Sequence, residues 1–401
     1  MIDHAEILAR AKRGEKEIVD FLVDLLAIPS PSAKEGPVTE RVADEMRRLG
    51  FDEARIDGLG NVIGRIGDGP RVIAFDAHAD TVEAGDRAQW SFDPFQPHVF
   101  EGKVWGRGAA DQKGGLASMV HAGRIIRELG LGHDLTLLFV GSVQEEDCEG
   151  MAWKHLVETE KIRPELVVLT EPTGLNIHRG HRGRMEIEIE VRGRSCHASA
   201  PERGESAAYK VARFALEIER LNEWLAVDAF LGKGTVAVTE IATGSPSLCA
   251  VPDSARLHLD RRLTAGETRE KAVAEVREAA GRAGIPEAGI FVPEYLVPSH
   301  TGRIVPYEKS FPTWTLEESS PWLRKAAIAY ASLFGHAAKV DKWTFSTNGV
   351  GIMPAYGIPC LGFGPGHESQ AHAADEYCPV DHLPLAAAFY ASLAAELSGK
   401  G

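Results

Sequence analysis

The sequence predicts an α/β fold in which a mostly parallel sheet is flanked by helices and a smaller α+β domain is inserted. Three observations support this prediction. Helical and strand-like segments alternate up to about residue 175, the pattern changes to half-polar strands over residues 180–298, and the alternation then resumes. The chain has 401 residues, and because a single hydrophobic core stops growing near ~250–300 residues, two domains are expected.

The first part of the chain has the helices and buried strands of an α/β domain. Helical patterns cover residues 6–26, 35–49 and 114–129, and the first of them ends at "PSPS", where proline stops a helix. Short apolar runs follow at "NVIGRI", "RVIAF", "LTLLFVGS" and "LVVLTEP". Such alternation favours helices packed on a mostly parallel sheet.

The middle of the chain reads as a separate small domain. "RMEIEIEVRG" alternates apolar and charged residues strictly, which is typical of a strand with one solvated face. Helical patterns at residues 206–225 and 268–283 enclose the strand-like runs "TVAVTEIATG" and "SARLHLDRRL". We therefore predict one domain from residues 1–179 and 299–401, with an insert at 180–298. A helix near 322–334, a strand at "IPCLGFGPG" and a helix over 383–397 complete the first domain.

Composition limits the partners and the compartment. The formal net charge is −14, with 58 acidic and 44 basic residues, which argues against nucleic acid or an anionic membrane as a partner. The five cysteines are widely spaced and lack a Cys-x-x-Cys pair, so a reducing cytoplasm is expected. The N-terminal sequence has neither the form of a signal peptide nor that of a membrane anchor.

Acidic residues and histidines occur where apolar strands end. Open α/β sheets bind ligands at the carboxyl ends of their strands, so these residues are candidates for one site. Taken singly, each also suits a turn, a helix cap or a solvated acidic loop. The candidates are His78, Asp80, Asp111, Glu145, Glu146, Glu171 and His372.

Taken together and in order, these stretches resemble a known family. His78-Ala-Asp80, "GRGAADQKGG", Glu145-Glu146, Glu171-Pro-Thr and a late His372 followed by Asp-Glu span nearly the whole chain. This order is similar to that of the co-catalytic zinc hydrolases, which include aminoacylase, acetylornithine deacetylase, succinyl-diaminopimelate desuccinylase and glutamate carboxypeptidase. "WTFSTNG" and "GFGPGHESQAH" look most like a subgroup linked to selenium metabolism.

The resemblance implies a pair of divalent metal ions, with zinc as the default and cobalt or manganese as alternatives. His78, Asp111 and Glu171 would hold one ion. Asp111 would bridge to the second, held also by Glu146 and His372. Asp80 would support His78, and Glu145 would be the general base.

The resemblance also implies roles for the insert, as a ferredoxin-like dimerisation or lid domain. Within "GRSCHASAPERG", His197 would stabilise the oxyanion from the partner subunit of a homodimer. Arg262 resembles an arginine that holds a substrate carboxylate, but an exposed strand arginine is an equal reading. Asn348 would add a polar contact to the substrate. The stretch "SLCAVPD" departs from the family by placing Cys249 near a position where asparagine is common.

The expected activity is hydrolysis of an amide bond in a small N-acyl amino acid, ureido acid or short peptide. Glu171 as third ligand favours, by resemblance, a deacylase or carboxypeptidase. One alternative is a mononuclear iron oxygenase built on His78, Asp80 and His372, which would leave the other carboxylates without a task. Another is a non-catalytic metal-bound binding or scaffold protein, which would not need to keep Glu145 and His197.

Overall fold

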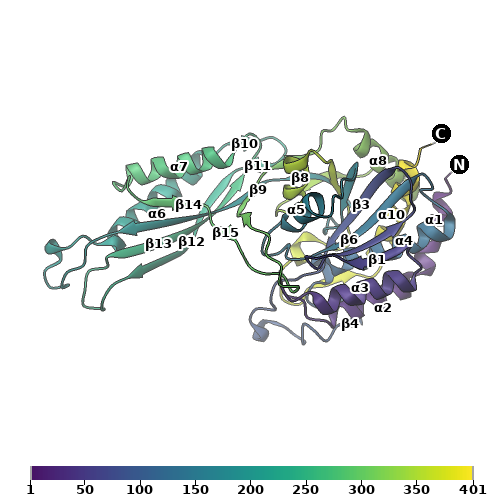
Figure 1. Cartoon of the computed structure of the whole chain (residues 1–401), viewed down its shortest axis with the longest axis horizontal. Coiled ribbons are helices and arrows are strands. Elements are labelled where there is room, and N and C mark those ends of the chain that lie inside the picture. The colour runs from purple at the N-terminus through teal and green to yellow at the C-terminus, as the bar shows by residue number, and fades with distance from the viewer. Residues whose placement is uncertain (1, 400–401) are drawn as a thin grey trace. The chain divides into compact units, whose positions relative to one another are not determined.

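The computed structural model describes residues 2–399, which fall into two compact units (Figure 1). Unit 1 runs to Gly180, includes Leu296–Val305 and resumes at Thr315, and unit 2 comprises His181–Tyr295 and Pro306–Trp314. The predicted insert of residues 180–298 corresponds to the first passage through unit 2, within three residues at each end, and lacks the second passage. Pro306–Trp314 belongs to unit 2 because its strand β17 (Ser310–Phe311) pairs with β9 (Gly183–Arg192) of that unit.

Unit 1 is built on a mixed sheet that is parallel at its centre. Strand β3 (Arg71–His78) lies between β6 (Leu135–Ser142) and β7 (Leu166–Leu169), parallel to both, and β20 (Cys360–Gly362) is parallel to β7. The full order is β1-β2-β6-β3-β7-β20-β8-β18, and β19 pairs with β8. The outer strands are β1 (Glu53–Ile56), β2 (Val62–Ile66), β8 (Ile177–His181), β18 (Trp314–Thr315) and β19 (Val340–Trp343).

Helices surround this sheet (Figure 1). They are α1 (His4–Arg13), α2 (Glu15–Leu26), α3 (Gly36–Arg48), α4 (Gly114–Leu129), α5 (Met151–Glu158), α8 (Pro321–Phe334), α9 (Met353–Tyr356) and α10 (His382–Leu397). The prediction of a single helix over residues 6–26 is wrong, because the segment forms two helices. The chain forms α1 and α2, which meet at Gly14, because glycine is the poorest helix former after proline.

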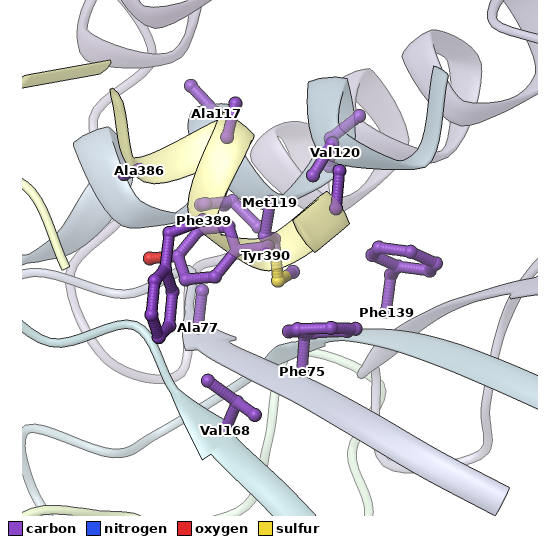
Figure 2. Packing of buried hydrophobic residues seen from close by; sticks show 14 of the residues in the cluster. Phe75, Ala77, Ala117, Met119, Val120, Phe139, Val168, Ala386, Phe389 and Tyr390 are labelled. Atoms are coloured by element: carbon purple, nitrogen blue, oxygen red, sulfur yellow. The ribbon is translucent and has the colours of Figure 1, made fainter. Parts of the chain in front are cut away.

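The alternation of β3 decides which of its side chains reach the core. Phe75 and Ala77 join the main hydrophobic cluster with Phe139 of β6, and the Phe75 and Phe139 rings stack with centroids 5.3 Å apart. Figure 2 shows these residues beneath Phe389 and Tyr390 of α10. Since neighbouring strand residues point to opposite faces, the residues between and after them on β3 face away from this cluster.

Unit 2 has the α+β composition that its sequence predicts. Its antiparallel sheet has the order β12-β13-β9-β14, with β12 (Thr235–Gly244), β13 (Ser254–Leu263) and β14 (Gly289–Phe291). Helices α6 (Ala207–Trp224) and α7 (Arg269–Arg282) bury Phe214 and Val276 in a core with the alternate residues of β9, such as Ile187 and Ile189. The strict apolar and charged alternation of β9 thus corresponds to one buried and one solvated face.

Short elements complete the two units. They are β4 (His98–Phe100), β5 (Lys103–Trp105), β10 (Val227–Asp228), β11 (Gly232–Lys233), β15 (Glu294–Tyr295), β16 (Tyr307–Glu308) and β21 (Tyr377–Pro379). The one-turn helical segments are η1 (Arg87–Gln89), η2 (Ala109–Lys113), η3 (Pro201–Arg203), η4 (Asn348–Gly351) and η5 (Glu368–Gln370). Among residues 2–399, no helix has both the length and the apolar character needed to cross a bilayer.

Candidate metal centre

The ends of the parallel strands bring the predicted residues together. In the register of the sheet, His78 at the end of β3 pairs with Ser142 at the end of β6. Asp76 of β3 pairs with Leu169 at the end of β7. Because these three strands end at the same edge, Glu145 and Glu171, which follow β6 and β7, meet His78 there.

Two histidines face the same carboxylate from opposite sides. His78 Nε2 lies 2.9 Å from one oxygen of Asp111, Oδ1. The other oxygen, Oδ2, lies 3.6 Å from His372 Nε2. Each oxygen of Asp111 thus faces a different imidazole, and all of these groups are possible metal ligands.

Three glutamates complete the cluster. Oxygens of Glu171 and Glu145 lie 3.8 and 3.9 Å from His78 Nε2, and Glu146 lies 2.9 Å from His372 Nε2. Histidine and carboxylate atoms within 4.8 Å of one another form the sets His78–Asp111–Glu146 and His78–Glu145–Glu171. Nitrogen and oxygen ligands of this kind suit zinc and similar divalent metals.

Charge and burial in the cluster indicate that a cation belongs there. Burial raises the pKa values of Glu145 and Glu171 well above the usual range, and nearby carboxylates add to the rise. Burial alone would lower the pKa of His78, yet the hydrogen bond with Asp111 and the glutamates raise it well above its usual value. Glu145 Oε1 and Glu171 Oε2 are buried and have no hydrogen-bond partner among residues 2–399. These orphaned acceptors fit a divalent ion.

Asp80 contacts more of the cluster than predicted. The Nδ1–H of His78 donates to the carbonyl oxygen of Asp80 at 2.9 Å, so Nε2, which faces Asp111, is the nitrogen that a metal ion would bind in place of a proton. The Asp80 carboxylate accepts the backbone N–H groups of Glu145 and Glu146, each at 3.1 Å. Asp80 therefore fixes the imidazole through its backbone carbonyl and the acidic pair through its carboxylate.

Glu376, which the sequence analysis did not single out, holds the loop that contains Asp111. Its buried carboxylate accepts the N–H groups of Gly108, Ala110 and Asp111 at 2.8–3.0 Å and a hydrogen bond from Arg107 at 2.8 Å. Burial raises the pKa of Glu376 to about 7 although Arg107 opposes the rise. The sequence signal for Glu376 is the Asp-Glu pair that follows His372.

The prediction that Asn348 contacts the substrate does not agree with its geometry. Its side chain is buried, and its amide nitrogen donates to Asp76 and to Ser142, both at 2.9 Å. Its amide oxygen accepts the N–H of Gly150 at 2.8 Å. Asn348 thus connects β3, β6 and the start of α5, and both of its amide hydrogens are already used.

Two further predicted residues belong to unit 2. Arg262 on β13 forks onto Asp260, with Nε–Oδ1 and Nη2–Oδ2 distances of 2.7 and 3.2 Å, so a substrate carboxylate would have to displace Asp260. His197 is exposed, and its Nδ1 accepts the N–H of Ser199 at 3.1 Å. This contact leaves the imidazole proton on Nε2, which is then a hydrogen-bond donor.

A third set of possible ligands in unit 1 is Asp57, His155 and Glu160. The carboxylate oxygens of Asp57 and Glu160 both lie 3.7 Å from His155 Nε2. Arg55 already pairs with Glu160 at 2.9 Å and supplies the positive charge there, so we assign no metal to this set.

Comparison with known proteins identifies the family. The model of peptidase family M20/M25/M40 matches residues 74–396. The chain belongs to this family. Its motif-based resemblance to the co-catalytic hydrolases is thereby confirmed, and the chain is a member of a family of metal-dependent hydrolases.

Individual relatives cover nearly the full length. The chain is 50% identical over 387 residues to the uncharacterized protein YgeY of Escherichia coli K12, covering 96% of each. It is 27% identical over 396 residues to succinyl-diaminopimelate desuccinylase of Methylocella silvestris, covering 94% of this chain and 96% of that protein. The structure of Bacillus subtilis YxeP, described as a dinuclear metal-binding peptidase, superposes with a TM-score of 0.70 at 17% identity over 96% of this chain and 99% of that one. That likeness extends the comparison to the fold.

Proposed function

We propose that this protein is a di-metal amidohydrolase that cleaves an amide bond of a small N-acyl amino acid, ureido acid or short peptide. The observation that supports this most directly is the position of Asp111 between His78 and His372. One oxygen of Glu145 lies 3.9 Å from His78 Nε2, and its other oxygen accepts no hydrogen bond from a described residue. In our proposal Glu145 is the base and Glu171 is a metal ligand, as the family resemblance implies.

His78, Asp111 and Glu171 would hold one ion, and Asp111, Glu146 and His372 the other. Two such ions, zinc by default and cobalt or manganese as alternatives, would supply an activated water and a polarised carbonyl. Glu145 removes the proton of the attacking water and returns it to the leaving amine. Burial raises the pKa of Glu145, which strengthens this carboxylate as the acceptor of the water proton.

His197 is proposed to donate a hydrogen bond from Nε2 to the carbonyl oxygen as negative charge develops on it. The contact of its Nδ1 with Ser199 supports this role because it sets the tautomer. In our proposal His197 acts on the active site of the partner subunit in a homodimer.

The proposed homodimer forms through unit 2. Strand β12 is at the edge of its sheet, where unpaired N–H and C=O groups favour pairing with another strand. Large apolar side chains are exposed on β12 and on α6, namely Ile241, Leu216, Tyr209 and Trp224. Light scattering should give twice the chain mass, and Ile241→Pro should shift it toward the monomer. A monomeric wild-type protein would contradict the proposed dimer.

Amine release by metal-reconstituted protein tests the activity. The panel contains N-acetyl, N-succinyl and N-carbamoyl amino acids and dipeptides, each assayed beside Glu145→Gln. We expect turnover of at least one class, its loss in the variant, and an unchanged content of two metal ions per chain by elemental analysis. Turnover that persists in Glu145→Gln would refute the base, and silence over the whole panel with both metals bound would favour a binding role.

A further inference from the structure

The loop of residues 30–35, between α2 and α3, lies against the end of β3. The carbonyl of Ser30 accepts the N–H of Thr81 at 2.9 Å, and the Ser30 hydroxyl donates to the carbonyl of Ala79 at 2.8 Å. The Ser32 hydroxyl donates to the carboxylate of Asp80 at 2.7 Å. This loop is therefore attached to the strand end that delivers His78 to the metal centre.

Glu35 reaches from this loop to the backbone beside Glu145. Its side chain is fully buried, and Oε1 accepts the N–H of Ala33 at 2.9 Å and the N–H of Gln144 at 3.0 Å. Gln144 directly precedes Glu145 and has a φ of +57°, in the left-handed region that residues other than glycine rarely adopt. Such a conformation persists only where the surroundings hold it.

Two carboxylates thus bind three consecutive N–H groups. Glu35 accepts that of Gln144, while the two oxygens of Asp80 accept those of Glu145 and Glu146. Together they set the backbone from which the side chain of Glu145 projects toward His78.

The side chain of Glu35 has no role in starting the helix that it precedes. Glu35 is the N-cap of α3, yet its side chain makes no capping hydrogen bond. The helix uses only its carbonyl, which accepts from Val38 and Thr39 at 3.0 Å. Both hydrogen bonds to Oε1 instead come from the 30–35 loop and from Gln144.

His300 contacts the second oxygen of Glu35, with Nδ1 3.3 Å from Oε2. It belongs to Leu296–Val305, the part of unit 1 that the chain forms between two passages through unit 2. The ring sits over Gly60, where an added Cβ would lie 2.1 Å from His300 Cε1. The hydroxyl of Thr301 donates to the carbonyl of Gly58 at 2.9 Å and anchors the same segment.

We propose that Glu35 is a positioning residue for Glu145, that it acts as a hydrogen-bond acceptor for the Gln144 N–H, and that His300 orients it. This inference rests on the proposed role of Glu145 as the base. A displacement of about 1 Å at a reacting group can lower a rate roughly 100-fold. Loss of this acceptor should therefore lower kcat and leave substrate binding nearly unchanged.

The test compares Glu35→Ala, Glu35→Gln and His300→Ala with a matched control, Glu45→Gln. Glu45 is also a buried glutamate, but it lies within helix α3 and pairs with Arg41 and Arg48. Hydrogen–deuterium exchange of the peptide that contains Gln144 is measured for each metal-loaded protein. Steady-state kinetics use the panel compound that the wild type hydrolyses fastest.

We expect Glu35→Ala to speed exchange at Gln144 by about tenfold or more, as loss of a hydrogen bond to a charged group predicts. Its kcat should fall about 10- to 100-fold, with KM within about threefold of the wild type. Glu35→Gln should restore kcat to within about threefold, because its amide oxygen can accept the same two N–H groups. His300→Ala should also speed exchange at Gln144 and lower kcat, and Glu45→Gln should change neither.

Wild-type exchange and kcat in Glu35→Ala would overturn the proposal. So would a Glu35→Gln protein as slow as Glu35→Ala, because that result would assign the effect to charge. If Glu35→Ala does not fold, unchanged exchange in the less buried His300→Ala would overturn it. Turnover that survives in Glu145→Gln refutes the proposed function instead, and exchange at Gln144 still reports whether Glu35 holds that backbone.

Discussion

Replacing Glu376 by glutamine should weaken metal binding through the loop that contains Asp111. One oxygen of Glu376 accepts the N–H groups of Ala110 and Asp111, and the other accepts from Gly108 and Arg107. A glutamine amide has one acceptor oxygen, so one of these two pairs of donors would face an NH₂ group. The substitution therefore removes two hydrogen bonds while leaving the volume of the side chain unchanged.

The magnitude follows from burial. Arg107 is only 3% exposed, and breaking a buried ion pair by removing one charge typically costs about 3–5 kcal/mol. Loss of a residue that orients a metal ligand lowers metal affinity by about 10- to 100-fold. Glu376→Gln should therefore lower both the free energy of unfolding and the affinity for the metal pair.

The assay is competition for the metal with a chromophoric chelator, accompanied by urea unfolding of the metal-loaded and metal-free proteins. Glu45→Gln is again the matched control, since Glu45 pairs with arginines on α3 away from the cluster. It should lose stability and keep wild-type metal affinity. Metal affinity in Glu376→Gln equal to that of the wild type would refute the reasoning.

Three further substitutions test separate parts of the structure. Asn348→Ala should lower the free energy of unfolding by about 1–3 kcal/mol, because it leaves buried partners unpaired. It should leave KM unchanged. A large rise in KM with normal stability would instead show that Asn348 contacts the substrate. His382 has a pKa lowered to about 4, mainly by burial, whereas an unfolded histidine titrates near ~6.5. The unfolded state therefore binds more protons between these values, so stability falls as pH drops through this window, and urea unfolding at pH 7 and pH 5 should show a smaller loss for His382→Asn. Phe389 is buried and stacked on Phe363, with ring centroids 3.8 Å apart. Phe389→Ala should lower the free energy of unfolding by about 3–5 kcal/mol and leave kcat per folded molecule unchanged.

The sequence predicted the position of the site better than it predicted the residues that hold the site in place. His78, Glu145 and Glu171 end strands or follow them directly, so the rule that ligands bind at the carboxyl ends of parallel strands was enough to place them together. Asp111 and His372 required the family resemblance, because each lies in an irregular segment. Their roles in catalysis remain predictions that the experiments above address.

Residues whose function depends on distant partners were missed or misread. Glu376 binds N–H groups more than 260 residues earlier in the chain, and Asn348 bonds to Asp76 at a separation of 272 residues. Periodicity and local motifs describe only neighbours in sequence, so neither pairing was visible. The boundary of unit 2 was misjudged for the same reason, because the pairing of β17 with β9 links segments far apart in the chain.

The residues that position the site all use carboxylate groups as hydrogen-bond acceptors. This explains why an acidic cluster is surrounded by further acidic residues. An ionised carboxylate has only hydrogen-bond acceptors and no donor, so both of its oxygens can bind backbone N–H groups. Glu35, Asp80 and Glu376 all use carboxylate oxygens to bind N–H groups of the candidate site residues or of their neighbours. At Asp80 and Glu376 both oxygens accept backbone N–H groups, so an asparagine or glutamine there would present its NH₂ donors to some of them. The cost is negative charge in a buried region, which Arg107 offsets at Glu376 and which, in our proposal, the metal pair offsets for the cluster itself. Removal of the metals should therefore loosen these backbone segments first, and exchange at Gln144 and Asp111 should rise before that of the core strands.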